Sequence, residues 1–246
     1  MMSPSDKTDA FLGGRLAVRQ GAYRAGADPV FLAAAVPARS GQSVLELGVG
    51  SGVALFCLAS RVPGLRLVGL ERAPEAAALA RTNADANQID ADIIEGDVAA
   101  MPEVLRARSF DHVMMNPPFF DTGTPSDDPG RRVARHEETA LADWLDAGVR
   151  RLKPGGALTL IHATERVPDI LSGLSGRLGG LTLRPLAPRA GRAAKRVILR
   201  GTKGARAPFR MLAPFILHDG DSHLRDGDSY TQAATRILRN GEAFPD

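Results

Sequence analysis

Cysteine is almost absent from this sequence: Cys57 is the single cysteine among 246 residues. One cysteine cannot build a disulfide framework or a cysteine-based zinc site, and it fits a reducing compartment. Long apolar runs are also missing, and no stretch approaches the roughly 20 residues of a membrane-spanning helix. Residues 1–9 are polar, include two aspartates and lack the basic and then apolar layout of a signal peptide. We therefore expect a cytoplasmic protein that does not enter a membrane.

The composition is that of a globular protein, with 44% hydrophobic and 24% charged residues. The length suits one large domain, or a domain with additions. The net charge is only +3, but it is unevenly distributed. From Arg150 to Arg210 there are fourteen Lys and Arg against two acids, a local charge of +12, so the rest of the chain carries −9. This asymmetry indicates a polyanionic partner, or else a solvated basic face on an arginine-rich protein.

Apolar runs of strand length alternate with helix-length segments through the middle of the chain, which is typical of an α/β fold with a parallel sheet covered by helices. The expected strands are residues 43–47, 66–70, 92–95, 110–115, 157–162, 181–186 and 195–201. The expected helices are residues 53–60, 74–87, 102–106 and 141–152. Within the last of these, Trp144 shares an apolar face with Leu141 and Leu145 and is expected in the core.

The segments outside this alternation are assigned from turn and capping residues. Residues 11–18 are expected to form a small hairpin or strand, and Asp28 to cap a helix over residues 29–36. Lys153–Gly156 is expected to be a turn. A strand within residues 212–217 and a helix over residues 230–239 are expected near the C-terminus, and the Gly-, Pro- and Asp-rich residues 120–135 form a long loop.

A glycine-rich turn follows the first expected strand, where open α/β sheets bind ligands. Gly48, Gly50 and Gly52 do not match the dinucleotide spacing G-x-G-x-x-G, because the position three after Gly50 is Val53. Glu46 precedes the loop. A carboxylate there would repel a pyrophosphate but attract a cationic ligand, such as the ammonium and sulfonium groups of S-adenosylmethionine.

Two further acids follow the next two expected strands. Glu71 ends the second and can bind both hydroxyls of a ribose, and Asp97 follows the third and is placed to bind the exocyclic amine of the cofactor's adenine. Either acid alone could be a helix cap or a solvated charge. Three acids at three successive strand ends, with Glu46 the first, favour a binding site.

Asn116, Pro117, Pro118 and Phe119 follow the buried strand of residues 110–115. The two prolines fix φ and force Asn116 into an extended conformation, so its amide is held in place. The Asn116 side-chain oxygen and the Pro117 carbonyl can each accept a hydrogen bond from a planar NH2 group, while Phe119 offers a ring for a flat heterocycle to stack on. The same tetrapeptide is also compatible with an ordinary turn.

These motifs in this order resemble the class I S-adenosylmethionine-dependent methyltransferases, over about residues 23–201. Asn-Pro-Pro followed by an aromatic residue resembles the branch that methylates planar amine or amide nitrogens. The resemblance implies a Rossmann-like fold: a mostly parallel seven-stranded sheet with helices on both faces and small N- and C-terminal additions. It divides the chain into an extension or hairpin at 1–22, the methyltransferase domain at 23–206 and an extension at 207–246.

Shorter motifs resemble the bacterial tRNA adenine N6-methyltransferases that modify the adenine beside the anticodon. They are Tyr23-Arg24 with Gly26–Asp28, Arg135–Glu137, Leu152–Gly156 and Pro188–Gly191. Phe119 stands where that family more often has tyrosine, and the match weakens after Gly201. The resemblance implies S-adenosylmethionine as cofactor, tRNA as partner and no metal. The basic residues expected to bind the RNA are Arg189, Arg192, Lys195 and Arg196.

Three functions remain compatible with these residues. The first is N6-methylation of an adenine in tRNA. The second keeps the cofactor and changes the acceptor to a protein glutamine, methylated at N5, or to another RNA or a small molecule, because a carboxamide presents the same NH2 donors. The third is a non-catalytic binding module, which the intact acids and Asn116 disfavour. The basic cluster favours RNA, and the oligomeric state is not indicated.

Overall fold

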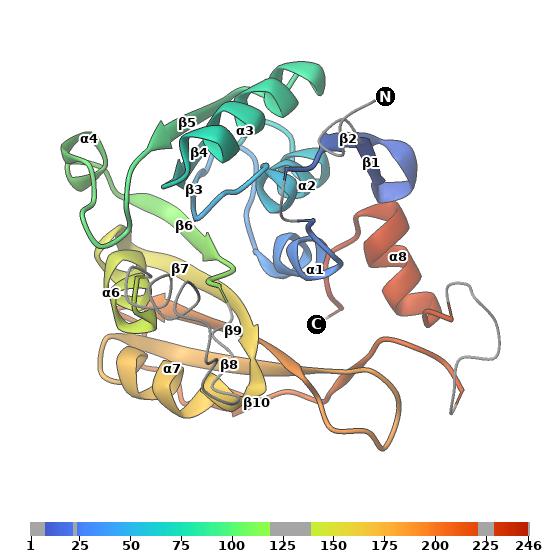
Figure 1. Cartoon of the computed structure of the whole chain (residues 1–246). Coiled ribbons are helices and arrows are strands. Elements are labelled where there is room, and N and C mark those ends of the chain that lie inside the picture. The colour runs from blue at the N-terminus through green and yellow to red at the C-terminus, as the bar shows by residue number, and fades with distance from the viewer. Residues whose placement is uncertain (1–7, 22–23, 119–138, 221–228, 246) are drawn as a thin grey trace, which may run out of the picture.

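The alternating runs form one sheet in the computed structural model, which describes residues 8–21, 24–118, 139–220 and 229–245 (Figure 1). The strands of its body are β3 (Ser43–Leu47), β4 (Arg66–Glu71), β5 (Ala91–Glu95), β6 (Phe110–Met115), β7 (Leu152–Ala163), β8 (Leu178–Ala187) and β9 (Arg196–Lys203). All neighbours pair in parallel except β9, which is antiparallel to β7 and β8. The mostly parallel sheet is therefore confirmed, but it has nine strands rather than the predicted seven.

Two short strands extend the sheet along β8. They are β10 (Arg210–Met211) and β11 (Phe215–Ile216), and both pair with β8 in parallel. The single strand expected within residues 212–217 is thus replaced by two shorter ones. The full strand order is β10-β8-β9-β7-β6-β3-β4-β5, with β11 beside β8.

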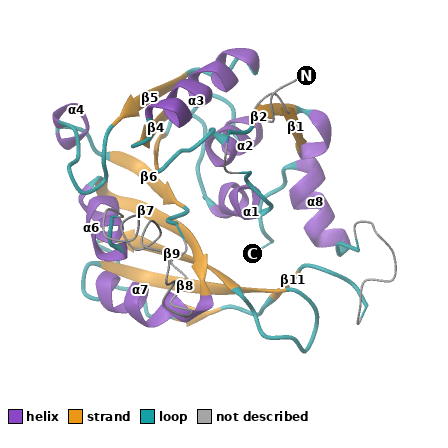
Figure 2. Cartoon of the chain, viewed as in Figure 1, coloured by secondary structure: helices purple, strands orange, loops and turns teal. Residues whose placement is uncertain are grey.

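Helices cover both faces of the sheet (Figure 2). They are α1 (Asp28–Ala35), α2 (Val53–Arg61), α3 (Pro74–Ala86), α4 (Glu103–Arg106), α6 (Leu141–Arg150), α7 (Val167–Leu174) and α8 (Gln232–Asn240). Successive residues of a strand point to opposite faces, and the two cores follow that alternation. Val44 packs in the core that contains α1, α2 and α3 side chains, while its neighbours Leu45 and Leu47 pack in the core that contains α6 and α7 side chains.

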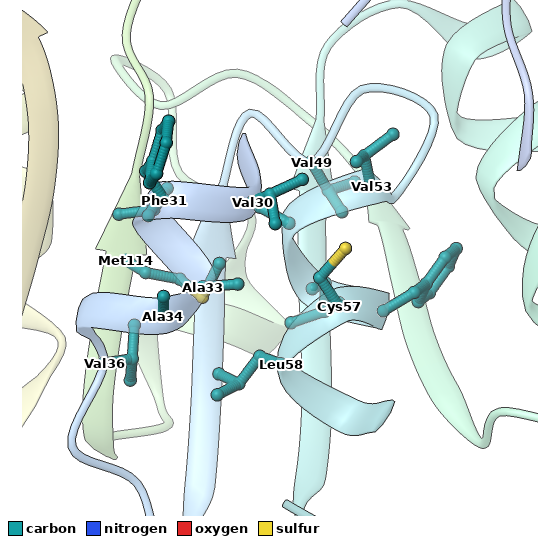
Figure 3. Close-up of a cluster of buried hydrophobic side chains, with 14 of the residues drawn as sticks. Val30, Phe31, Ala33, Ala34, Val36, Val49, Val53, Cys57, Leu58 and Met114 are labelled. Carbon is teal, nitrogen blue, oxygen red and sulfur yellow. The ribbon is translucent and has the colours of Figure 1, made fainter. Parts of the chain in front are cut away.

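Helices α1 and α2 pack closely because both present small or branched apolar residues to each other. Figure 3 shows Val30 and Ala33 of α1 facing Cys57 and Leu58 of α2, with Met114 of β6 beneath them. All five are buried. Burial also raises the pKa of the Cys57 thiol above its ordinary value, so Cys57 is an apolar packing residue.

The chain order places a switch point beside β3. From β3 the chain proceeds outward through β4 and β5, and it then returns to the other side of β3 through β6 and β7. Loops that follow β3 and β6 therefore diverge at the carboxyl edge of the sheet. This divergence leaves room for a ligand, as in other open α/β sheets.

The N-terminal residues form the expected hairpin, β1 (Thr8–Phe11) and β2 (Leu16–Arg19), joined by a 3-10 turn over Leu12–Gly14. Asn83 of α3 and Asn87, which directly follows that helix, hold the outer edge of the hairpin. Asn83 accepts the N–H of Arg19 (2.9 Å) and donates to its carbonyl (3.0 Å), and Asn87 makes the same pair with Ala17 (3.0 and 2.7 Å). The hairpin is thereby fixed against α3.

The C-terminal residues fold back onto the same region. Helix α8 packs against the 3-10 turn and α1, and Thr231 caps it by accepting the N–H of Ala234 (3.1 Å). Phe244 then packs its ring against Phe31 and Phe215, at centroid distances of 5.9 and 4.8 Å. The boundaries proposed at residues 22 and 206 stay predictions.

Two local expectations were wrong, and one helix was not expected. Asp28 does not cap α1; it is the first residue of that helix, and its carboxylate accepts a hydrogen bond from Arg196. Lys153–Gly156 is not a separate turn, because β7 begins at Leu152 and includes this segment. The register between β6 and β7 shifts there, and Gly155 has φ +76°. Helix α7 was not expected, because Pro168 and Gly173 interrupt its short apolar pattern.

Candidate active site

A cavity of about 970 Å³ opens at the carboxyl edge of β3, β4 and β6, beside the switch point. Residues 48–51 of the glycine loop line it, but Gly52 does not. Glu46, Glu71 and Asp97 line it as well, together with Asn116, Pro117 and Pro118. The structure therefore brings together the glycine loop, the three acids and the Asn-Pro-Pro segment. Phe119, Tyr23 and His136 lie outside the described residues.

The glycine loop is held by β4 rather than by its own side chains. Gly48 and Val49 donate backbone N–H groups to the carbonyl of Leu70 (2.8 and 3.0 Å). Gly48 has φ +68°, and a Cβ there would lie 2.6 Å from Cη2 of Trp144, so only glycine fits. Gly50 and Gly52 also have positive φ, at 54° and 94°. The loop can thus present its backbone to a ligand.

Glu71 joins the loop to the end of β4. Its Oε2 accepts the N–H of Gly50 and its Oε1 accepts the N–H of Ala73, both at 2.9 Å. Each carboxylate oxygen has a second lone pair. Glu71 is therefore oriented at the cavity wall and can still accept two hydrogen bonds, and binding of the ribose hydroxyls there stays a prediction.

Glu46 is the most deeply buried acid of the cavity, with 3% of its surface exposed. Burial raises the pKa of its carboxyl well above the ordinary value; the backbone N–H of Leu55 opposes that rise, and the charge of Glu71 adds to it. Its Oε2 has no hydrogen-bond partner among the described residues. A cationic hydrogen-bond donor would lower the free-energy cost of burying this carboxylate. The α-ammonium of S-adenosylmethionine is such a donor.

Asp97 lies in the cavity wall after β5. Its Oδ1 accepts the N–H of Ala99 (2.8 Å) and the hydroxyl of Thr139 (3.1 Å), and Arg72 lies 3.8 Å from its Oδ2. These contacts fix the carboxylate while leaving it accessible to a ligand. Binding of an adenine amine there stays a prediction.

Asn116 directly follows β6 and lines the cavity, and of the two prolines after it Pro117 is buried and Pro118 is exposed. The Asn116 Oδ1 is buried and accepts no hydrogen bond from any described residue. A buried acceptor without a partner costs about 1–3 kcal/mol, so this oxygen favours a ligand that brings an N–H or O–H donor. An exocyclic NH2 group meets that requirement.

Comparison with known proteins decides the family. The sequence profile of the methyltransferase small domain family matches residues 26–178, which is more than half of the chain. The chain belongs to this family. The cofactor is therefore S-adenosylmethionine. The matched range holds the glycine loop, all three acids and Asn116, and their contacts with the cofactor stay predictions.

Curated relatives carry a narrower name. A tRNA1(Val) (adenine(37)-N6)-methyltransferase of Porphyromonas gingivalis is 36% identical over 158 residues, which are 61% of this chain and 62% of that protein. One of Aeromonas hydrophila subsp. hydrophila is 32% identical over 210 residues, 83% of this chain and 86% of that protein. The match thus spans under two thirds of the first relative and most of the second.

Solved structures show the same fold. The crystal structure of a predicted O-methyltransferase from Agrobacterium tumefaciens has a TM-score of 0.71 and 26% identity, and the match covers 89% of this chain and 98% of that one. A Thermus thermophilus 16S rRNA N2 G1207 methyltransferase, in complex with AdoMet and guanosine, has a TM-score of 0.58 and 20% identity, covering 80% and 50%. The Rossmann-like class I methyltransferase fold is therefore confirmed.

The four basic residues expected to bind RNA divide into two pairs, and none of them lines the cavity. Arg189 is 7% exposed and donates to the carbonyls of Asp219 and Gly220, so its guanidinium joins the loop after β8 to residues 219–220. Arg196 pairs with Asp28 at 3.1 Å. Arg192 and Lys195 are exposed on the loop between β8 and β9. The RNA-binding role of all four stays a prediction, and the exposed pair is better placed for it.

Sequence reasoning missed several side chains of this methyltransferase cavity, among them Trp144 and Gln20. Trp144 was expected in the core and is 7% exposed, but it also lines the cavity against Gly48, and its Nε1 has no partner among the described residues. Gln20 lines the cavity from the segment after β2. No local pattern marks a glutamine after a hairpin, so only the folded chain shows that it reaches the site.

The described residues also bear on metals and membranes. Within them, no three His, Cys, Asp or Glu side chains are grouped as metal ligands would be. No helix in the same ranges is long and apolar enough to cross a membrane.

Proposed function

We propose that this methyltransferase transfers the methyl group of S-adenosylmethionine to N6 of an adenine in tRNA. The observation that carries the proposal is the buried Oδ1 of Asn116, which has no hydrogen-bond partner in the described parts of the chain and lies in the same cavity as the glycine loop, Glu46 and Glu71. The names of the Porphyromonas and Aeromonas relatives support adenine in tRNA as the acceptor.

The cavity residues match the groups of the cofactor. Glu46 is a buried carboxylate that needs a cation, Glu71 offers two oriented acceptors, and Asp97 offers a third at the next strand end. When bound, S-adenosylmethionine supplies a methyl group on a positively charged sulfur. The glycine loop brings its backbone close to that ligand, because Gly48 has no Cβ to contact Trp144.

Asn116 orients the acceptor nitrogen. The lone pair of an adenine N6 is delocalised into the ring, which makes the nitrogen a poor nucleophile. Hydrogen bonds from its NH2 group to Asn116 Oδ1 and to the Pro117 carbonyl favour a pyramidal nitrogen with its lone pair directed at the methyl carbon. Transfer would then be an in-line displacement that depends on positioning. The N–C bond would form as the S–C bond breaks, S-adenosylhomocysteine would leave, and the methylated nitrogen would afterwards lose a proton. The adenine has to leave any base stack to enter the cavity.

The acceptor is tested by giving the protein labelled S-adenosylmethionine with separate pools of unmodified tRNA, ribosomal RNA and protein. We expect label in tRNA, recovered as N6-methyladenosine after digestion. Label in the protein pool alone, at glutamine, would replace the proposal with the amide-methylating alternative.

The reaction centre is tested with Asn116→Ala. Loss of a group that positions the reacting atoms costs about 10²–10³ in rate, whereas binding of S-adenosylhomocysteine should weaken only modestly. The matched control is Asn240→Ala, because Asn240 is exposed at the end of α8 and its side chain donates to the exposed Glu242. Normal turnover by Asn116→Ala would place the reaction centre elsewhere.

A further inference from the structure

We infer that Gln20 binds the α-carboxylate of the cofactor's amino-acid group, as the counterpart of Glu46 for the ammonium; this rests on the proposed function. Gln20 follows β2 directly, lines the cavity and is 3% exposed. Its Nε2 is buried and has no hydrogen-bond partner among the described residues. A buried amide N–H of this kind favours a ligand with an acceptor.

The orientation of the Gln20 amide is set by its other end. Oε1 accepts the backbone N–H of Ala25 (3.2 Å) and the hydroxyl of Ser51 (3.4 Å). A backbone N–H can only donate, so the atom facing Ala25 is the oxygen and the free atom is the nitrogen. The amide therefore offers the two N–H donors of Nε2 to the cavity, whereas its oxygen already accepts two hydrogen bonds.

Contacts around Gln20 place it at the glycine loop. Asn83 holds the backbone of Arg19, the residue before Gln20, and also donates to the carbonyl of Ser51 (2.9 Å). One side chain of α3 thus joins the hairpin to the loop. Since the loop begins two residues after Glu46, Gln20 and Glu46 border the same end of the cavity.

Charge in the cavity identifies the ligand group. An ammonium can only donate, so it suits Glu46 and not the Nε2 of Gln20. A carboxylate only accepts, and it needs donors in a wall that already contains Glu46, Glu71 and Asp97. Among the described lining residues Arg72 is the single basic one, and it lies beside Asp97. The neutral amide of Gln20 is the donor that the glycine-loop end offers to a carboxylate.

Two ligands and one substitution test the assignment by calorimetry. S-Adenosylhomocysteine carries both the ammonium and the carboxylate, whereas S-adenosyl-3-thiopropylamine carries the same ammonium and no carboxylate. Gln20→Glu keeps an oxygen for Ala25 and Ser51 but replaces the donor with a charged acceptor. We expect it to weaken S-adenosylhomocysteine at least about tenfold, the loss of a hydrogen bond to a charged group, and to leave the amine ligand's Kd unchanged or lower.

Controls separate the possible failures. Gln232→Glu makes the same change on the exposed face of α8 and should bind both ligands as the wild type does. Gln20→Met removes the amide without adding charge, and it should also weaken only the ligand with the carboxylate; it replaces Gln20→Glu if that variant does not fold.

Each outcome has one meaning. Equal weakening of both ligands by the Gln20 variants would make Gln20 a structural residue, and unchanged binding would give it no role, so either overturns the inference. Failure of the wild type to bind S-adenosylhomocysteine would instead overturn the proposed function.

Discussion

Replacing Glu46 with glutamine should make the free protein more stable and remove its ability to bind the cofactor. The substitution keeps the size and shape of the side chain, and the new amide oxygen can still accept the N–H of Leu55. What disappears is a carboxylate that is 3% exposed and has an unpartnered oxygen among the described residues. Such a group is costly without a ligand and useful with one, as is common for residues of a functional site.

The size of the effect follows from burial. The new NH2 group would also have no partner among the described residues, so the gain comes from removing the charge: an unsatisfied buried group costs about 1–3 kcal/mol when neutral and more when charged. For a chain of this length 1 kcal/mol moves the melting temperature by about 2–4 °C, so Glu46→Gln should raise it by several degrees. S-Adenosylhomocysteine at 100 times its Kd should stabilise the wild type by about 2.7 kcal/mol, and the variant should lose most of that gain.

The pH dependence has a definite sign. Because burial raises the pKa of Glu46 above its ordinary 4.5, the folded state holds this proton more tightly than the unfolded state does. Glu46 therefore costs stability progressively as pH rises above about 4.5 toward its folded pKa, and costs nothing extra below that range. The advantage of Glu46→Gln should be small near pH 4 and largest at neutral and higher pH.

The measurement is thermal unfolding by circular dichroism between pH 4 and 8, with and without S-adenosylhomocysteine. Glu103→Gln is the control, because Glu103 is an exposed acid in the first turn of α4 and its loss should change neither quantity appreciably. A Glu46→Gln protein that melts at or below the wild-type temperature and keeps the full ligand-induced shift would refute the assignment of Glu46 to the ammonium.

Three other outcomes are expected. Gly52→Ala should destabilise the fold by several kcal/mol and weaken cofactor binding, as measured by urea unfolding and calorimetry, because φ is +94° and the new Cβ would lie 2.1 Å from the ring of Phe56; a stable, cofactor-binding variant would contradict this. Burial, reinforced by nearby positive charge, lowers the pKa of His162 to about 4. As pH falls below about 6.5 the unfolded state therefore binds this proton before the folded state does, and the free energy of unfolding should decrease from about pH 6.5 toward 4. His162→Gln should reduce that decrease, as measured by urea unfolding at a series of pH values. Replacing Arg192 and Lys195 together with alanine should lower the salt dependence of tRNA binding by roughly two units without changing cofactor affinity; an unchanged slope in filter binding would return both residues to a solvated surface.

Local chemistry was enough to place most of the sheet. The apolar runs at Ser43–Leu47 and Phe110–Met115 are strands with the predicted bounds, because each is short, buried on both faces and ends at glycine, asparagine or proline. The same reasoning located the glycine loop, the three acids and Asn116, since the carboxyl ends of parallel strands meet at one edge of a sheet. These features depend on residues that are neighbours in the chain.

Tertiary structure alone decided which distant side chains share an environment. The sequence predicted that Arg189 contacts RNA. Its guanidinium instead donates to the carbonyls of Asp219 and Gly220, about thirty residues further along the chain, and no local pattern could reveal that contact. Gln20 becomes a cavity residue only because Asn83 joins its hairpin to the glycine loop. Sequence periodicity reports the local backbone and which face is buried, whereas the partner of a buried polar group is chosen by packing between distant segments.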